Sequence, residues 1–191
     1  FLTGTTTEAN VADFFRERQM VFTPVNFDSV NKVVAAYEAG QCDSYTADQS
    51  QLYAIRLKLK APDDHIILPD VISKEALGPM VRQGDEQWFN IVRWTLFALV
   101  NAEELDVKAA SVEDLKASSK IPAVRRLLGL EGSFGSDMGL DADWAARAIK
   151  ATGNYSEMFE RNLGKDSQLG IARGINALWN AGGLLYVPPV R

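Results

Sequence analysis

The residues with the clearest capacity for chemistry stand in two short stretches of this sequence. The first, GTTTEANVADFF at residues 4–15, sets a Gly and three Thr directly before a helical pattern. The N–H groups at the start of a helix lack partners and carry partial positive charge, so this stretch could bind a carboxylate or a phosphate. Gly4 would permit a tight turn and a close approach of the ligand, and the hydroxyls of Thr5 and Thr6 would add donors.

The alternative interpretation of this first stretch is a plain helix cap. Thr5 and Glu8 have the spacing of a capping box, in which both side chains serve only their own helix. Local chemistry alone favours the cap over a ligand site.

Asp48 is the second candidate. It lies in GQCDSYTADQSQL, residues 40–52, at the carboxyl end of an expected strand, where open parallel sheets place their ligands. It could equally cap the helix that follows. Taken together, one strand end offers donors and another offers a carboxylate. This pair complements a zwitterion that carries an α-carboxylate and an α-ammonium group.

Both stretches need a scaffold that brings strand ends together. The first third of the chain alternates short strand patterns with helical patterns. The expected strands are residues 1–3, 20–27, 42–47 and 65–72, and the expected helices are residues 7–18, 28–40 and 48–60. Alternation with connections this short predicts an α/β fold with a mostly parallel sheet covered on both faces.

Helical patterns dominate the second half of the chain. Residues 85–105 form a long pattern that is apolar over much of its circumference, so we expect this helix to be buried. Further helical patterns follow at residues 111–119, 121–129, 141–152, 154–163 and 168–183. The aromatic residues of these later patterns are expected in the core and not at a ligand. They are Trp144, Tyr155, Phe159 and Trp179.

Composition argues against several classes of function. The 191 residues carry a net charge of −5, which argues against a nucleic-acid partner because phosphate binding needs clustered basic residues. One Cys and one His cannot build a thiolate or imidazole metal site, and we expect no cofactor. His65 is expected at a strand entry and not as a catalytic base. The longest apolar run, residues 88–100, is too short to cross a bilayer.

The sequence resembles the periplasmic general L-amino acid-binding proteins of bacterial ABC transporters, which are type II solute-binding proteins. The resemblance rests on GTTTEANVADFF, on the block from YEAGQCDSYTADQSQL to LFALVNAEEL at residues 37–105, and on the ending GGLLYVPPVR at residues 182–191. It covers essentially the whole chain. The long block and the ending are its specific parts, because the Gly-Thr-Thr turn and the Asp motif recur in many solute-binding proteins.

The resemblance implies a two-lobed periplasmic receptor that closes on a free L-amino acid and delivers it to ABC permease subunits in the membrane. Such a receptor breaks no bond and is not an enzyme. Thr5 and Thr6, with Gly4 in the turn, would contact the α-carboxylate, and Asp48 would hold the α-ammonium. The implied fold is a periplasmic-binding-protein-like lobe with a mostly parallel sheet, followed by a helical carboxyl-terminal extension. The implied divisions are a second lobe at 1–71, a return segment at 72–105 and the extension at 106–191.

The departure from the family pattern is at the front of the chain. Full members begin with a segment that supplies an Arg for the carboxylate, and they carry a Cys just ahead of the TGTTTE turn, which is the implied partner of Cys42. We therefore expect a truncated carboxyl-terminal portion that binds amino acids weakly or not at all, with nanomolar-to-micromolar binding by the full protein. A homodimer is expected to cover the helix that bears Trp88, Trp94 and Phe97.

Two other functions remain open on the sequence alone. An enzyme on the same scaffold, such as a dehydratase of cyclic amino acids, would need a general acid that faces the pocket. A ligand-sensing effector domain of a regulator would be recognised by a DNA-binding segment upstream, and none is visible in these residues.

Overall fold

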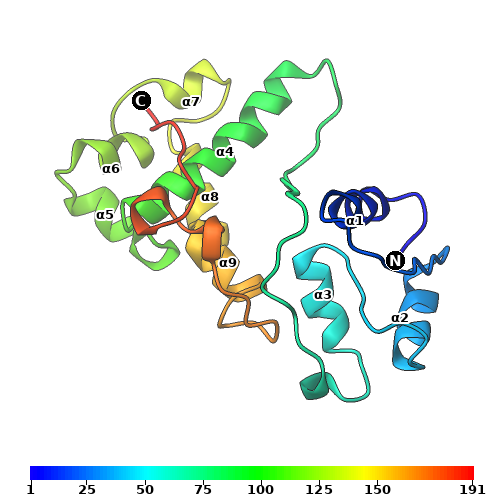
Figure 1. The fold of residues 1–191 in the computed structure, drawn as a ribbon. Coiled ribbons are helices and arrows are strands. Elements are labelled where there is room, and N and C mark those ends of the chain that lie inside the picture. The colour runs from blue at the N-terminus through cyan, green and yellow to red at the C-terminus, as the bar shows by residue number, and fades with distance from the viewer. The chain divides into compact units, whose positions relative to one another are not determined.

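The computed structural model describes residues 1–191 and consists of helices and connecting loops (Figure 1). Contacts between residues group the chain into two compact units, Phe1–Leu77 (unit 1) and Gly78–Arg191 (unit 2). The division into segments 1–71, 72–105 and 106–191 stays a prediction. None of the helices has both the length and the apolar character that a bilayer crossing demands.

Unit 1 contains three α-helices. They are α1 (Thr6–Glu17), α2 (Val30–Glu38) and α3 (Gln49–Arg56), with a 3₁₀ turn at Pro62–Asp64. Each matches an expected helix, because apolar periodicity and end signals are local properties of the sequence. Gly40, two residues beyond α2, has a φ of 70°, the left-handed conformation that ends many helices. The buried apolar side chains of unit 1 are Val11, Val33, Ala36, Ile55 and Leu59.

The predicted α/β lobe with a mostly parallel sheet is wrong for this structure. Strand pairing in unit 1 is limited to one isolated parallel bridge between Leu2 and Phe27. Residues 42–47 and 65–72, which were expected as strands, make no ladder hydrogen bonds. The chain is helical in both units, and the expected sheet is absent from it.

The segment at residues 65–72 shows why the strand pattern was misleading. A short apolar run rich in β-branched residues favours extended backbone, but a sheet also needs a neighbouring strand to accept and donate hydrogen bonds. Ile66 is 79% exposed, Leu68 61% and Val71 78%, so these side chains have little cover in the structure. The extended conformation is a local preference, whereas a strand's partner is decided elsewhere in the chain.

Unit 2 is an all-helical assembly with one hydrophobic core. Its α-helices are α4 (Glu86–Glu104), α5 (Val112–Ser118), α6 (Pro122–Leu127), α7 (Phe134–Asp137), α8 (Trp144–Thr152) and α9 (Tyr155–Asn162). The long helix α4 contacts α6, α8 and α9, which wrap around its carboxyl-terminal half (Figure 1). Fully buried side chains of the core include Ala98, Val107, Leu128 and Ile149.

The expectation that the whole of α4 is buried is only half right. Its buried residues are confined to Ala98–Ala102, whereas Trp88 is 52% exposed and Phe89 is 42% exposed. The other helices of unit 2 pack on the second half of α4 and leave part of the first half open. Among the aromatic residues expected in the core, Trp144 and Phe159 are buried, Tyr155 is half-buried, and Trp179 is 50% exposed.

Two polar contacts fasten the end of the chain to α4. The amide Nδ2 of Asn101, which is only 8% exposed, donates to the backbone oxygens of Pro188 (2.8 Å) and Phe97 (2.9 Å). Arg173 forms a largely buried ion pair with Glu103 at 3.0 Å. These contacts hold the segment after α9 against α4, and Val190 completes the core beside them.

Replacing Asn101 with Ala is expected to lower the free energy of unfolding of unit 2 by about 1–2 kcal/mol, because a buried carbonyl loses its donor. The carboxyl-terminal residues should also become more accessible to carboxypeptidase. Asn90→Ala is the matched control on the same helix, since the Asn90 side chain accepts only from the exposed Arg93. Equal effects of the two substitutions in urea unfolding would contradict the anchoring role of Asn101.

Candidate functional site

The start of α1 is a closed capping network. Thr5 is the N-cap residue, and its hydroxyl accepts from Glu8 N at 3.4 Å and donates to Leu2 O at 2.8 Å. The Glu8 carboxylate accepts from Gly4 N at 2.7 Å, and Gly4 has a φ of 74°. The side chains of Thr5 and Glu8 therefore serve the helix, as the capping alternative predicted, although Glu8 bonds the amide of Gly4 and not that of Thr5.

Other donors at this helix start are free. The backbone N–H groups of Thr6 and Thr7 have no acceptor within the chain, and the hydroxyl of the exposed Thr6 makes no hydrogen bond. Sequence reasoning named Thr6 but missed Thr7. The signal was available, because the second residue of any α-helix has an N–H group without an intrahelical partner.

Asp48 lies at the N-cap position of α3, but its carboxylate makes no capping hydrogen bond. Its backbone oxygen accepts from Leu52 N at 2.9 Å, which starts the helix, while the half-buried side chain has no partner in the structure. The Asp48 side chain therefore does not cap α3 in this structure. Three residues earlier, burial raises the pKa of the Tyr45 phenol, so this group stays a neutral donor near pH 7.

The predicted site residues fall into two separate groups. Gly4, Thr5 and Thr6 stand together at the start of α1, whereas Asp48 makes no hydrogen bond to any of them. All four belong to unit 1.

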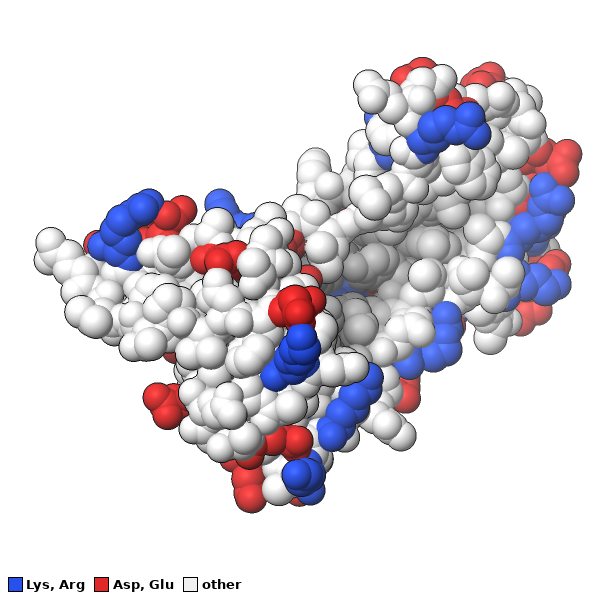
Figure 2. Space-filling model, turned by 90° about the vertical axis from the view of Figure 1, so that its right-hand side faces the viewer, with Lys and Arg blue, Asp and Glu red and all other residues white.

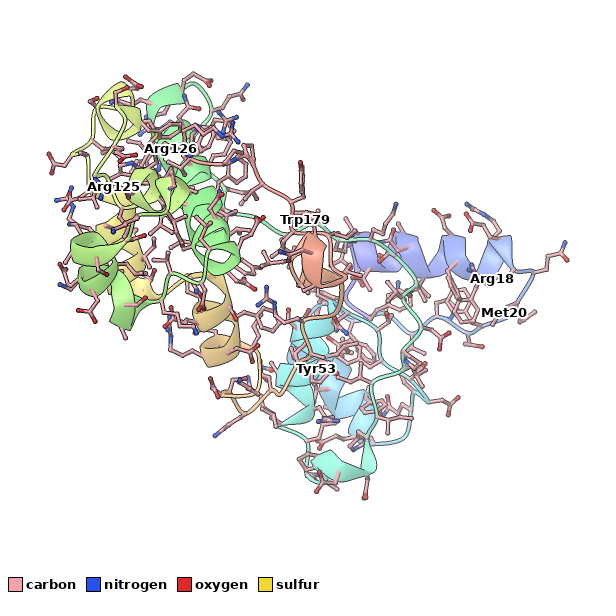
Figure 3. The ribbon with its side chains drawn as sticks, turned by 90° about the vertical axis from the view of Figure 1, so that its left-hand side faces the viewer. Arg18, Met20, Tyr53, Arg125, Arg126 and Trp179 are labelled. Atoms are coloured by element: carbon pink, nitrogen blue, oxygen red, sulfur yellow. The ribbon has the colours of Figure 1, made fainter.

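A shallow groove of about 460 Å³ runs along α1 from Thr6 to Arg18 and is closed on its other side by Val71–Glu75. The Asn10 amide donates to the Glu75 carboxylate across it at 2.9 Å. Arg18 lies at the carboxyl end of α1 (Figure 3). Its guanidinium lies over the Phe14 ring, 3.7 Å from the ring centroid. That guanidinium lies at the opposite end of the helix from the free amides of Thr6 and Thr7.

The remaining candidates for chemistry have ordinary surroundings. The Tyr37 hydroxyl lies 2.9 Å from His65 Nδ1, so the single histidine is paired with a phenol and not with a nucleophile. Cys42 is a half-buried free thiol. No three potential metal-ligating side chains gather anywhere in the structure. Positive and negative side chains are interspersed on the visible face in Figure 2.

Comparison with known proteins finds relatives that match nearly the whole chain. AapJ of Rhizobium johnstonii, a general L-amino acid-binding periplasmic protein, is 57% identical over 190 residues, which are 98% of this chain and 55% of AapJ. YhdW of Escherichia coli, a putative amino-acid ABC transporter-binding protein, is 54% identical over 98% of this chain and 55% of YhdW. BztA of Rhodobacter capsulatus, a glutamate/glutamine/aspartate/asparagine-binding protein, is 52% identical over 99% of this chain and 56% of BztA.

A solved structure is equally similar. The ABC transporter periplasmic binding protein from Brucella ovis, determined with glutathione bound, matches 100% of this chain and 60% of its own length with a TM-score of 0.94 and 54% identity. No protein-family model matches the chain.

These relatives are solute-binding proteins and not enzymes, which agrees with the function class expected from the resemblance. The chain spans about 55% of the length of the curated relatives that it matches. Sequence identity above 50% across nearly all of its residues shows that this chain and these relatives are homologous. Over nearly all of its residues, the chain is therefore homologous to a part of the periplasmic amino-acid-binding proteins of ABC transporters.

Proposed function

We propose that this chain supplies one part of a periplasmic receptor that binds a free L-amino acid for uptake by an ABC transporter. The observation that carries the proposal is the carboxylate of Asp48, which is half-buried at a helix start and yet makes no hydrogen bond. A half-buried acid without a partner is suited to a cationic ligand group. The names of AapJ and BztA support a ligand of the amino acid class.

In this proposal the two ends of the amino acid are held by opposite chemistry. The α-carboxylate accepts from the free N–H groups of Thr6 and Thr7 and from the Thr6 hydroxyl, at the positive end of the α1 dipole. Gly4 and Thr5 shape the turn in front of these donors, and Thr5 acts through the cap and not by direct contact. The α-ammonium donates to Asp48. Affinity comes from charge-assisted hydrogen bonds, and no covalent step occurs.

A second ligand class is favoured by the glutathione in the Brucella ovis structure. Glutathione begins with a γ-linked glutamyl residue, which keeps a free α-ammonium and a free α-carboxylate on one carbon. A site that binds those two groups accepts a γ-glutamyl peptide as well as an amino acid, provided that the pocket admits the longer side chain. An α-linked peptide lacks the free α-carboxylate on its first residue and therefore cannot make both contacts.

The partners follow from the same role. We propose that the receptor delivers its ligand to the membrane permease subunits of an ABC transporter, as expected for the family. We also propose that this chain pairs with a second copy through α4.

Calorimetric titration tests the ligand proposal. The panel comprises L-glutamate, N-acetyl-L-glutamate with its ammonium blocked, L-isoglutamine with its α-carboxylate blocked, glutathione, and the α-linked Glu-Cys-Gly. It is applied to this chain and to an extended chimaera, in which the part of AapJ that this chain does not match is joined to it. We expect micromolar or tighter binding of L-glutamate and glutathione by the chimaera, weaker binding by this chain, and none for the other three compounds. Equal binding of N-acetyl-L-glutamate would refute the role of Asp48.

A further inference from the structure

The Glu8 carboxylate is held at both oxygens beside the free amides of α1. Its Oε2 accepts from Gly4 N at 2.7 Å, and its Oε1 accepts from the side-chain amide of Asn26. Glu8 is half-buried, and the second of these contacts comes from a residue 18 positions away in the sequence. The position of this carboxylate is therefore set by two separate segments of unit 1.

The segment that carries Asn26 is itself bound to the residues that precede α1. Thr3 N donates to Phe27 O at 2.9 Å, and Phe27 N donates to Phe1 O at 3.1 Å. Asn26 is thus fixed through its neighbour against the same stretch that leads into the Gly4 turn. A capping box alone needs only the helix and its own turn, so the contact from Asn26 is an addition to the cap.

The negative charge of Glu8 has no compensating cation. Both of its partners are neutral, because one is a backbone N–H and the other is an amide. Gly4 N and Thr6 N are two residues apart, so the backbone lets them separate by no more than about 7 Å. Glu8 Oε2, which is hydrogen-bonded to Gly4 N, therefore lies within about 10 Å of Thr6 N, the Debye length at about 0.1 M salt. An anion bound at the Thr6 amide is affected by this charge.

A fixed negative charge acts differently on a zwitterion and on an anion. An α-carboxylate and an α-ammonium on one carbon sum to no net charge, so the repulsion of one is largely offset by the attraction of the other. A ligand with the carboxylate alone has only the repulsion. The positive end of a helix dipole is equivalent to about half a charge, so it does not cancel a full negative charge.

We propose that Glu8 is a specificity-determining residue, which makes the start of α1 select a zwitterion over an anion of the same shape. This inference rests on the proposed function, because it requires the α-carboxylate of the ligand to bind at Thr6 and Thr7. Its role differs from that of Asp48, which bonds the ammonium directly. Glu8 acts without touching the ligand, by raising the free energy of any bound anion that brings no positive charge.

The variant Glu8→Gln tests this inference, because it removes the charge and keeps the contacts. The Gln oxygen accepts from Gly4 N, its NH₂ group donates to Asn26 Oδ1 once the Asn26 amide is turned over, and Gln also suits this position of a capping box. The extended chimaera is titrated calorimetrically with L-glutamate and, in competition with it, with glutarate, which is glutamate without its α-ammonium. We expect the affinity for glutarate to rise at least fivefold and that for L-glutamate to change less than twofold. Far-UV circular dichroism establishes that the variant is folded.

Glu38→Gln is the matched control. Glu38 is another carboxylate of unit 1 that accepts from a backbone N–H, that of Lys60 at 2.9 Å, but it lies at the end of α2. It should leave the ratio of the two affinities unchanged. If the ratio in Glu8→Gln equals that of the unsubstituted chimaera, or falls equally in both variants, the inference is overturned and the proposed function stands. A chimaera that binds no L-glutamate overturns both.

Discussion

Replacing Asp48 with Asn is expected to weaken binding of L-glutamate by the extended chimaera by about 100-fold or more, because the α-ammonium loses a charged acceptor in a site shielded from water. The substitution keeps the shape of the side chain. It also keeps the helix start intact, since Asn is as good an N-cap residue as Asp. The loss should therefore come from the ligand contact and not from α3. Calorimetric titration measures it directly.

Asp43→Asn is the matched control for this experiment. Asp43 is exposed, lies five residues before Asp48, and belongs to the same stretch between α2 and α3. It should leave the affinity unchanged. Equal losses of affinity in the two variants would mean that net charge and not a specific contact governs binding. An unchanged affinity in the Asp48→Asn variant would show that Asp48 does not bind the ligand.

Replacing Gly129 with Ala is expected to lower the free energy of unfolding of unit 2 by about 3–4 kcal/mol, because two penalties add. Gly129 follows α6 with a φ of 76°, a conformation that residues with a Cβ disfavour. A Cβ there would also overlap the backbone carbonyl of Ala142, which cannot rotate away as a side chain could. The loop before α8 or the end of α6 must then move.

Gly132→Ala separates the two penalties. Gly132 has a φ of 86° in the same connection, but a Cβ at this position would have no atom within 4 Å. The Gly132→Ala substitution should lower the free energy of unfolding by only about 1–2 kcal/mol, which is the effect of the left-handed conformation alone. Guanidinium unfolding followed by tryptophan fluorescence reports on the right part of the chain, because all 4 Trp residues lie in unit 2. If both substitutions lower the free energy of unfolding equally, the overlap with Ala142 adds no destabilisation, which would contradict the second penalty.

The sequence by itself determined the local features of this protein. Helices α1, α2, α3 and α4 lie where apolar periodicity and end signals predicted them, and the Thr5–Glu8 spacing predicted a cap that the structure contains. These helices and this cap depend on residues within a few positions of one another, so the local sequence is enough to predict them. The family was also evident from the sequence, since long motifs identify relatives whatever the chain's packing.

Only the tertiary structure decided which of these elements find partners. Extended segments such as 65–72 resemble strands in isolation, but no second strand accepts their hydrogen bonds, and the predicted sheet does not form. The first half of α4 is as apolar as the second, yet α6, α8 and α9 cover mainly the second. Asp48 has the position of a cap, but its carboxylate stays free. In each case the outcome depends on contacts between residues distant in sequence, which no local pattern records.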